Sequence, residues 1–330
     1  MTELTEFVDL ASERLGGSAL ATNDEFFAPK ERLLKDVRPL FIEDRYTDRG
    51  KWMDGWETRR RRETGHDWCI IRLGLPGTIH GVIVDTSHFT GNYPEACSID
   101  AAIVSGYPGP DELASVAWRE ILPRSILAGD ARNQFPVHAT ERFTHLRLNI
   151  FPDGGVARLR VYGRARPDWG RLCGREIDLA AVEHGGLVLA ASDMFYGRRH
   201  NLIMPGPPLG MADGWETKRR RGPGHDWAIV ELGRPGRVNR AEVDTTHFKG
   251  NAPGRCSLDA CDAAELDVAD IVKPDRVWQV LLPETNLQPN TRHVFEELRS
   301  LQRVSHVRFN IFPDGGVGRL RLYGTVSGRD

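Results

Sequence analysis

Two stretches of this chain are nearly the same sequence. Residues 54–74 read DGWETRRRRETGHDWCIIRLG, and residues 213–233 read DGWETKRRRGPGHDWAIVELG. Fifteen of the 21 positions are identical at an offset of 159 residues. Self-similarity at a fixed spacing is the signature of a repeated structural unit. We therefore expect the 330 residues to form two copies of one domain, and the length agrees with two domains of ordinary size.

Two further blocks repeat in the same order. Residues 84–101 (VDTSHFTGNYPEACSIDA) correspond to 243–260 (VDTTHFKGNAPGRCSLDA) at the same offset, and residues 146–163 (LRLNIFPDGGVARLRVYG) correspond to 307–324 (VRFNIFPDGGVGRLRLYG) at an offset of 161. The larger offset indicates a short insertion in a surface loop of the second copy. The expected division is an N-terminal extension over 1–17, a first repeat over 18–163, a connector over 164–185 and a second repeat over 186–330.

Short apolar or alternating segments separated by Gly and Pro turns are typical of strands. In the first copy we expect strands over 68–73, 79–84, 97–103, 146–150 and 159–162, with turns at 74–77 and 152–155. Helix is expected only near 30–34, 111–115 and 295–301. The sequence thus predicts an all-β chain of two tandem jelly-roll β-sandwich domains. The strand order resembles the galactose-binding-like type, a generic resemblance that does not give function.

Composition excludes several classes of function. The formal net charge is −2, which gives no support to binding of nucleic acid or of a membrane surface. No apolar run approaches the roughly 20 residues that span a bilayer, and the N-terminal residues lack the basic and apolar regions of a signal peptide. Five cysteines without CxxC spacing favour reduced thiols and a cytoplasmic protein.

Polar side chains stay fixed between the copies, whereas core positions change conservatively, as Ile71 to Val230 illustrates. Residues 85–92 (DTSHFTGN) place Asp85, His88 and Asn92 on one loop. Asp85 and His88 suit acid–base catalysis, and Asn92 suits binding of a polar substrate. The alternative is a loop whose Asp and Asn cap their own backbone. The counterparts in the second copy are Asp244, His247 and Asn251.

The first block offers Glu57 and His66 as further catalytic candidates. Four arginines, at residues 59–62, lie between them. In an extended strand Arg60 and Arg62 share one face, and guanidinium groups bind carboxylates in a planar fork. We expect Arg60, Arg62 and Asp153 to bind substrate. The alternative for the two arginines is a solvated charged edge, and the alternative for Asp153 is a tight turn. The second copy has a counterpart for each of these five candidates: Glu216, Arg219, Arg221, His225 and Asp314.

Neither a metal nor an organic cofactor is expected. His66, His88, Asp85 and Asp153 are suitable ligand types, but no HxH, HExxH or Cys pair supplies local ligand spacing. A GxSxG nucleophile elbow and a glycine-rich phosphate loop are also missing from the sequence.

The three duplicated blocks together resemble the allantoicase family, over residues from about 18 to 324. The resemblance implies two jelly-roll repeats that hydrolyse allantoate to ureidoglycolate and urea in purine degradation, as a hydrolase of carbon–nitrogen bonds in linear amidines. It also implies a homo-oligomer. The alternative is a non-catalytic tandem carbohydrate-binding module on the same jelly roll, with Trp56, Trp68, Trp215 and Trp227 as sugar platforms. The fixed His and Arg residues weigh against it.

The repeated loops also differ. Thr90 corresponds to Lys249, and Glu95 corresponds to Gly254. Two independent, equivalent sites would keep the same reactive groups, so we expect one substrate per chain; drift at solvent-facing positions is the alternative.

Overall fold

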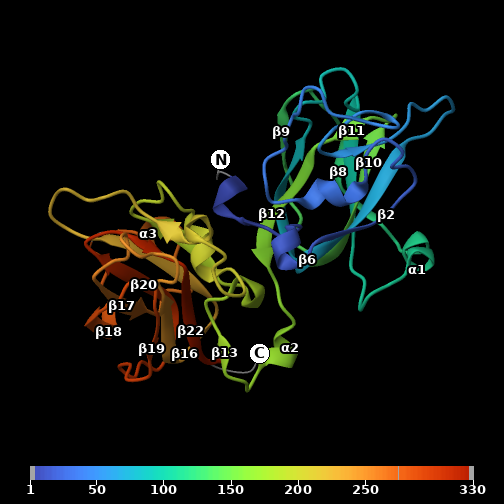
Figure 1. Ribbon diagram of the computed structural model, residues 1–330. Coiled ribbons are helices and arrows are strands. Elements are labelled where there is room, and N and C mark those ends of the chain that lie inside the picture. The colour runs from blue at the N-terminus through green and yellow to red at the C-terminus, as the bar shows by residue number, and fades with distance from the viewer. Residues whose placement is uncertain (1–3, 274, 327–330) are drawn as a thin grey trace. The chain divides into compact units, whose positions relative to one another are not determined.

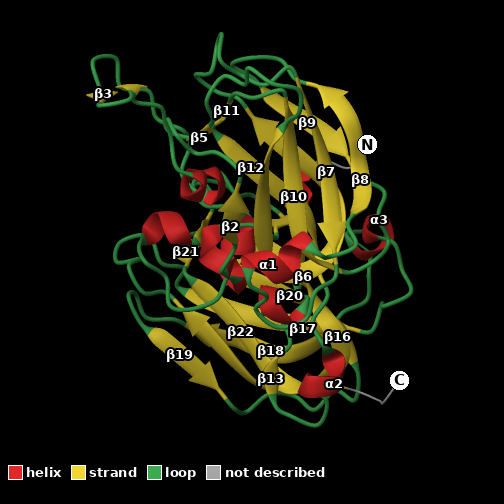
Figure 2. Ribbon diagram, turned by 90° about the vertical axis from the view of Figure 1, so that its right-hand side faces the viewer, coloured by secondary structure: helices red, strands yellow, loops and turns green. Residues whose placement is uncertain are grey.

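The computed structural model describes residues 4–273 and 275–326 and divides the chain into two units, residues 1–166 and 167–330 (Figure 1). Each unit consists mainly of strands with a few short helices (Figure 2). This confirms the predicted all-β class and the two tandem jelly-roll domains. Among the described residues, no helix combines the length and apolarity needed to cross a bilayer.

The strands of the two units follow the same order, except that the first unit contains an additional β3–β4 hairpin. In the first unit, a short α-helix α1 (Pro110–Ala114) and 3₁₀ helices over Leu4–Glu6, Glu13–Leu15 and Lys30–Leu34 accompany the strands β1 (Val8–Asp9), β2 (Ser18–Thr22), β3 (Tyr46–Thr47), β4 (Gly50–Lys51), β5 (Trp56–Glu57), β6 (Asp67–Asp85), β7 (Ala96–Ala102), β8 (Arg119–Ile126), β9 (Arg132–Pro136), β10 (Phe143–Phe151), β11 (Gly155–Val156) and β12 (Arg158–Ala165).

The second unit carries the helices α2 (Trp169–Leu172) and α3 (Val268–Ile271), 3₁₀ helices over Val182–His184, Arg199–Ile203 and Met211–Asp213, and the strands β13 (Ile177–Asp178), β14 (Leu187–Ala191), β15 (Trp215–Glu216), β16 (Asp226–Asp244), β17 (Arg255–Cys261), β18 (Gln279–Asn286), β19 (Arg292–Phe295), β20 (Val304–Phe312), β21 (Gly316–Val317) and β22 (Arg319–Val326). The strand order is β1-β12-β6-β10-β7-β8 in one unit and β13-β22-β16-β20-β17-β18 in the other.

One long strand organises each unit. The first part of β6 pairs with β2 and β10, and its last part pairs with β9 and β12. The turn expected at 74–77 is therefore wrong, because these residues lie within β6 where it passes from one set of partners to the other. A side chain at Gly77 would place Cβ 2.2 Å from the Arg164 carbonyl oxygen, so only glycine permits this close pairing.

The repeat boundaries differ from those expected. Val8 and Asp9 pair with β12, and Ile177 and Asp178 pair with β22, so parts of the expected extension and connector belong to the sheets. Each Asp fixes the pairing: Asp9 accepts hydrogen bonds from the amides of Ala11 and Val161. A weak sequence repeat marks these two short strands, VDLA at 8–11 and IDLA at 177–180.

The expected helices are formed in part. Residues 30–34 form a 3₁₀ helix, and α1 lies close to the expected 111–115. Helix over 295–301 is wrong, because Phe295 ends the strand β19 on β16 and the Arg299 amide donates to the Leu281 carbonyl oxygen. These pairings with the sheet occupy the backbone that a helix would need.

A buried arginine links the strands to the loops above them. Arg158, only 1% exposed, donates to the carbonyl oxygens of Val37, Asp54 and Ala157 and, at 2.7 Å, to the Asp54 carboxylate. Burial acts to raise the pKa of Asp54, but hydrogen bonds from Arg158 and the Leu40 amide outweigh it and hold that pKa below its usual value. Arg319 makes the same bonds to the carbonyl oxygen and carboxylate of Asp213 in the second unit.

We predict that Arg158→Met lowers the free energy of unfolding by about 3–5 kcal/mol, because it leaves the Asp54 carboxylate buried without its partner. Denaturation in guanidinium chloride, followed by tryptophan fluorescence, measures the change. Arg59→Gln is the control: Arg59 is exposed and pairs with Asp24 at the surface, where such a pair contributes about 0–1 kcal/mol. Equal losses in the two variants would contradict the assigned role of Arg158.

Candidate functional site

The three repeated blocks of the first unit meet at one place. β5, from the first block, pairs with β11, from the third, with Gly155 opposite Glu57. From the second block, Asn92 donates its side-chain amide to Oε1 of Glu57 at 2.6 Å, and its carbonyl oxygen accepts from the Gly155 amide at 2.7 Å. In the second unit Asn251 donates to Glu216 in the same way. Two predicted site residues, Glu57 and Asn92, are therefore in direct contact.

Phe89 anchors the loop that carries His88 and Asn92. Its side chain is fully buried, and a Cβ at Gly155 would lie 1.9 Å from the Phe89 ring. Glycine at that position therefore lets the ring pack under the loop. His88 has a positive φ of 71°, and its amide donates to the Asp130 carboxylate at 2.8 Å, which holds this uncommon conformation.

Glu57 has an environment suited to proton transfer. It is 8% exposed, and burial raises the pKa of its carboxyl above the usual range, against the opposing effect of the hydrogen bond from Asn92. A buried carboxyl with a raised pKa keeps its proton closer to neutral pH and can act as a general acid. Its counterpart Glu216 is half-buried.

Asp85 and His88 do not form a pair with each other in the described chain. Oδ1 of Asp85 accepts from the Ser87 amide at 2.9 Å, which is the local capping that the sequence left open as an alternative. His88 places Nε2 3.3 Å from the Pro39 carbonyl oxygen, and its ring stacks on Phe41. In the second unit, Asp244 caps Thr246, and His247 lies 2.9 Å from the Pro208 carbonyl oxygen.

The arginine run is a loop, because β5 ends at Glu57, so the predicted shared strand face of Arg60 and Arg62 is wrong. Arg59 and Arg61 have structural partners, Asp24 and Asp67 respectively. Arg60 and Arg62 are exposed and line a pocket of about 410 Å³ with Asn23, Asp24, Arg59, Arg61, Glu63 and Asp67. The arginine run of the second unit is also a loop. Arg219 and Arg221 lie after the end of β15, and the intervening Arg220 pairs with Asp226.

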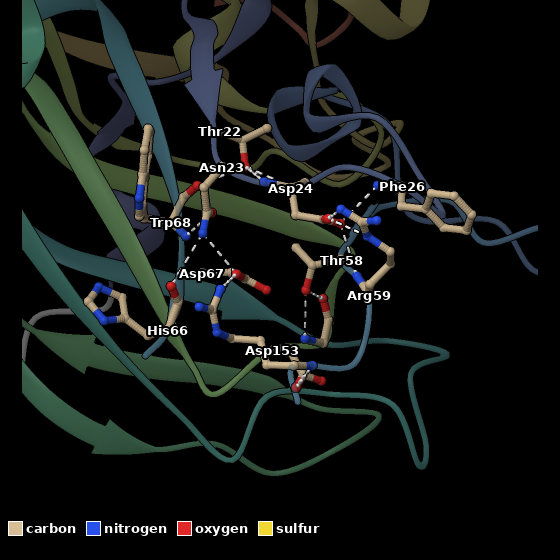
Figure 3. Close-up of polar contacts among 12 residues, drawn as sticks. Thr22, Asn23, Asp24, Phe26, Thr58, Arg59, His66, Asp67, Trp68 and Asp153 are labelled. Carbon is tan, nitrogen blue, oxygen red and sulfur yellow. Dashed lines mark hydrogen bonds and ion pairs between the residues drawn. The ribbon is translucent and has the colours of Figure 1, made fainter. Parts of the chain in front are cut away.

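Figure 3 shows how the neighbours of this loop are oriented. The ring of His66 points away from the carboxylate of Asp67, which accepts from Asn23 and Arg61. His66 instead packs on the Phe151 ring, with centroids 4.7 Å apart. Asp153 accepts from the Arg61 amide at 2.8 Å and thus holds the loop. In the second unit Asp314 accepts from the Arg220 amide, and His225 packs on Phe312 with Nε2 3.1 Å from Oδ1 of Asn310.

The sequence did not single out Arg158 and Arg319, although each pairs with the Asp that begins the first block, Asp54 and Asp213 respectively. Their signal was present, since an arginine stands at this position of the third block in both copies. In the part of the chain that the structure describes, no three His, Cys, Asp or Glu side chains gather as metal ligands would.

Comparison with known proteins places the chain in a family. The model of the allantoicase repeat matches residues 8–166 and again residues 177–327. The chain belongs to the allantoicase repeat family. It is 50% identical over 323 residues to a probable allantoicase of Burkholderia pseudomallei, covering 97% of this chain and 95% of that one. A probable allantoicase of Pseudomonas aeruginosa is 50% identical over 97% of this chain and 96% of its own.

A solved structure agrees with these relatives. The crystal structure of allantoicase from Saccharomyces cerevisiae superposes with a TM-score of 0.80 at 38% sequence identity, covering 96% of this chain and 92% of that one. The expected resemblance is confirmed over nearly the whole chain, and both repeats match the family model.

We predict that Gly155→Ala destabilises the first unit by about 1–3 kcal/mol, because its Cβ would overlap the buried Phe89 ring. Chemical denaturation gives the value. Gly91→Ala in the same loop region is the control, since a Cβ there meets nothing within 4 Å, and its effect should stay within about 0.5 kcal/mol. Similar effects of both substitutions would show that the ring contact does not hold the loop.

Proposed function

We propose that the protein hydrolyses allantoate to ureidoglycolate and urea. The observation that carries this proposal is the match of both repeats to allantoicases over nearly the whole chain. The repeated blocks of the first unit supply suitable groups: a buried carboxyl, imidazoles and exposed guanidinium groups. A urea assay on purified protein mixed with allantoate tests the activity directly, and absence of urea would reject it.

The chemistry requires a proton for a poor leaving group. Allantoate carries one carboxylate and two ureido groups on the same carbon, and water replaces one ureido group, which leaves as urea. Glu57 is proposed as the acid that protonates the departing ureido nitrogen, because its pKa is raised by burial. Asn92 holds the Glu57 carboxyl in place, and Arg60 and Arg62 bind the substrate carboxylate.

The attacking water must lose a proton to a base. When Nε2 of His88 donates to the Pro39 carbonyl oxygen, Nδ1 remains available to accept one. His66 is the second imidazole proposed to take part. Asp85 and Asp153 are proposed to act indirectly, since each accepts a hydrogen bond from the backbone of the loop it positions.

We place catalysis in the first repeat, with one substrate per chain. Glu57 is the more buried of the two counterpart carboxyls, and the second unit supplies the same contacts in a supporting role. Those second-unit positions are Glu216, Arg219, Arg221, His225, Asp244, His247, Asn251 and Asp314.

The carbohydrate-binding alternative requires tryptophans that can stack on a sugar, and two of the four candidates are buried. Trp56 and Trp215 are 0% exposed, and their indole N–H groups donate to the carbonyl oxygens of Asp24 and Asp193. A buried indole cannot stack on a sugar, so these residues belong to the core.

A cytoplasmic location is proposed as well. The free thiols of Cys69, Cys97, Cys173, Cys256 and Cys261 agree with a reducing compartment.

We predict that Glu57→Gln lowers kcat for urea release about 10²–10⁴-fold, the usual contribution of a general acid. Gln keeps an oxygen for the Asn92 amide, so the fold should persist. Wild-type kcat should fall as pH rises through the raised pKa of Glu57, since the protonated form is required. Ionising the buried Glu57 also weakens the folded state above that pKa, so the variant should melt no lower than wild type at pH 8.

Glu216→Gln is the matched control for this prediction and should cost less than Glu57→Gln. Equal losses would place catalysis in both repeats. Wild-type turnover in Glu57→Gln would remove Glu57 from the mechanism.

We also predict that His88→Ala and His88→Gly each lower kcat/KM for allantoate at least tenfold, because both remove the proposed base. Gly accepts the positive φ of this position, whereas Ala is strained there, so His88→Gly should melt at the higher temperature. Urea assays and thermal melting measure both effects. Normal turnover in a folded His88→Gly variant would exclude the imidazole from catalysis.

A homo-oligomer is proposed from the apolar surface of the first unit. Around the projecting β3–β4 hairpin (Figure 2), large apolar side chains are exposed: Val37, Leu40, Phe41, Ile42 and Tyr46. Contiguous exposed apolar residues mark interaction surfaces. We predict that Leu40→Asp lowers the particle mass measured by light scattering, whereas Val277→Asp, also at an exposed apolar residue, leaves it unchanged. A wild-type mass equal to one chain would reject the oligomer.

A further inference from the structure

A pocket of the second unit lies beside β13, β16 and β22, and neither Glu216 nor Asn251 is among its lining residues. Its volume is about 670 Å³. Charged side chains dominate its lining: Glu176, Asp178, Glu183, Glu242, Asp244, Arg292, Arg319 and Arg321, with His184 and Tyr323.

Three buried polar atoms of this lining accept or donate no hydrogen bond within the described chain: Oδ2 of Asp178, Oε2 of Glu183 and Nη1 of Arg321. Asp178 is 7% exposed, and its other oxygen accepts from the amides of Ala180 and Leu322. Nη1 of Arg321 and Oδ2 of Asp178 form an ion pair with each other at 3.6 Å, a separation longer than a hydrogen bond. Buried polar groups that make no hydrogen bond are costly, so Oε2 of Glu183 and this widely spaced ion pair indicate a place for a ligand.

In the first unit, the corresponding side chains are paired with other residues of the same unit. There Asp36 accepts from the Ser12 hydroxyl at 2.6 Å and lies 3.9 Å from Nη1 of Arg160, the counterpart of Arg321. Asp36 also lies 4.0 Å from Arg14. In the second unit Ser12, Arg14 and Asp36 correspond to Ala181, Glu183 and Pro205. One carboxylate faces this arginine in both repeats, Asp9 at 3.4 Å and Asp178 at 3.6 Å, but the second carboxylate, Asp36, has no counterpart in the second repeat.

The equivalence is fixed by structure as well as by sequence. Arg160 donates to the Lys35 carbonyl oxygen, and Arg321 donates to that of Met204, one residue before Pro205. Pro205 therefore occupies the position of Asp36 beside the same guanidinium group.

The second unit also adds charges that the first lacks. Glu242, 3% exposed, stands where the first copy has Ile83, and it binds Arg240 and Arg292 through its two oxygens. The side chain of Arg292 remains 60% exposed, so the buried carboxylate fixes this guanidinium at the pocket while its outer face stays open. Conversion of an apolar position to a buried ion pair needs a reason beyond packing.

We propose that this pocket of the second repeat binds a small carboxylic acid that carries ureido or amide N–H groups. Arg321 and Arg292 bind the carboxylate, in the place that Asp36 fills in the first repeat. Asp178 and Glu183 accept hydrogen bonds from the N–H groups. The site is distinct from the proposed catalytic loops of the first repeat and does not depend on allantoate hydrolysis.

Calorimetric titration of the full chain with N-carbamoylglycine tests the proposal, because this compound has one carboxylate and one ureido group. Acetate and urea, which each supply half of the recognition, should bind at least tenfold more weakly. The triple variant Ala181→Ser, Glu183→Arg and Pro205→Asp transfers the first repeat's groups and should weaken binding at least tenfold, since its own carboxylate occupies the site.

A single substitution provides a second test in case the triple variant does not fold. Arg292→Gln should weaken binding several-fold, whereas Arg132→Gln, at the exposed counterpart on β9 opposite Asp85, should leave it unchanged. Unchanged affinity in Arg292→Gln, or in a folded triple variant, would overturn the proposal. So would binding that is lost on Arg60→Gln instead. Urea release from allantoate is assayed separately, so its absence would reject the hydrolase while leaving this site intact.

Discussion

The buried ion pair between Asp54 and Arg158 ties the sheets to the loops of the first unit, and Asp213 with Arg319 does the same in the second. Each arginine begins the strand that closes the unit and donates to carbonyl oxygens of the long loop before β5 or β15. Its burial has a large desolvation cost, which only a full set of acceptors offsets. The loop must therefore follow one path, and that path places Glu57 or Glu216 under the Asn of the second block.

The same scaffold supports two different surroundings. In the first unit, Glu57 is buried and Asp36 completes the contacts of Arg160. In the second, Pro205 leaves Arg321 incomplete while Glu242 introduces a new charge beside it. The arginine contacts the loop before β5 in the first unit and the loop before β15 in the second, whereas positions beside the ion pair differ between the repeats.

The arginine run illustrates how one sequence serves both purposes. Arg59 and Arg61 bind Asp24 and Asp67 and shape the loop, and the Arg61 amide reaches Asp153. Arg60 and Arg62 remain exposed. A loop held by every second residue presents the remaining guanidinium groups with less freedom, which lowers the entropy lost when a ligand binds.

The sequence by itself determined the duplication, the all-β class, the jelly-roll units and the family, because repeated blocks and local strand patterns are written along the chain. It also predicted that Glu57 and Asn92 belong to one site. Only the tertiary structure decided that Gly74 to Gly77 continue β6, that the segments around Asp9 and Asp178 join the sheets, and that Asp85 caps its own loop. It also revealed Arg158 as the partner of Asp54, 104 residues away. These features depend on burial and on contacts between distant segments, and neither has a signature in local periodicity.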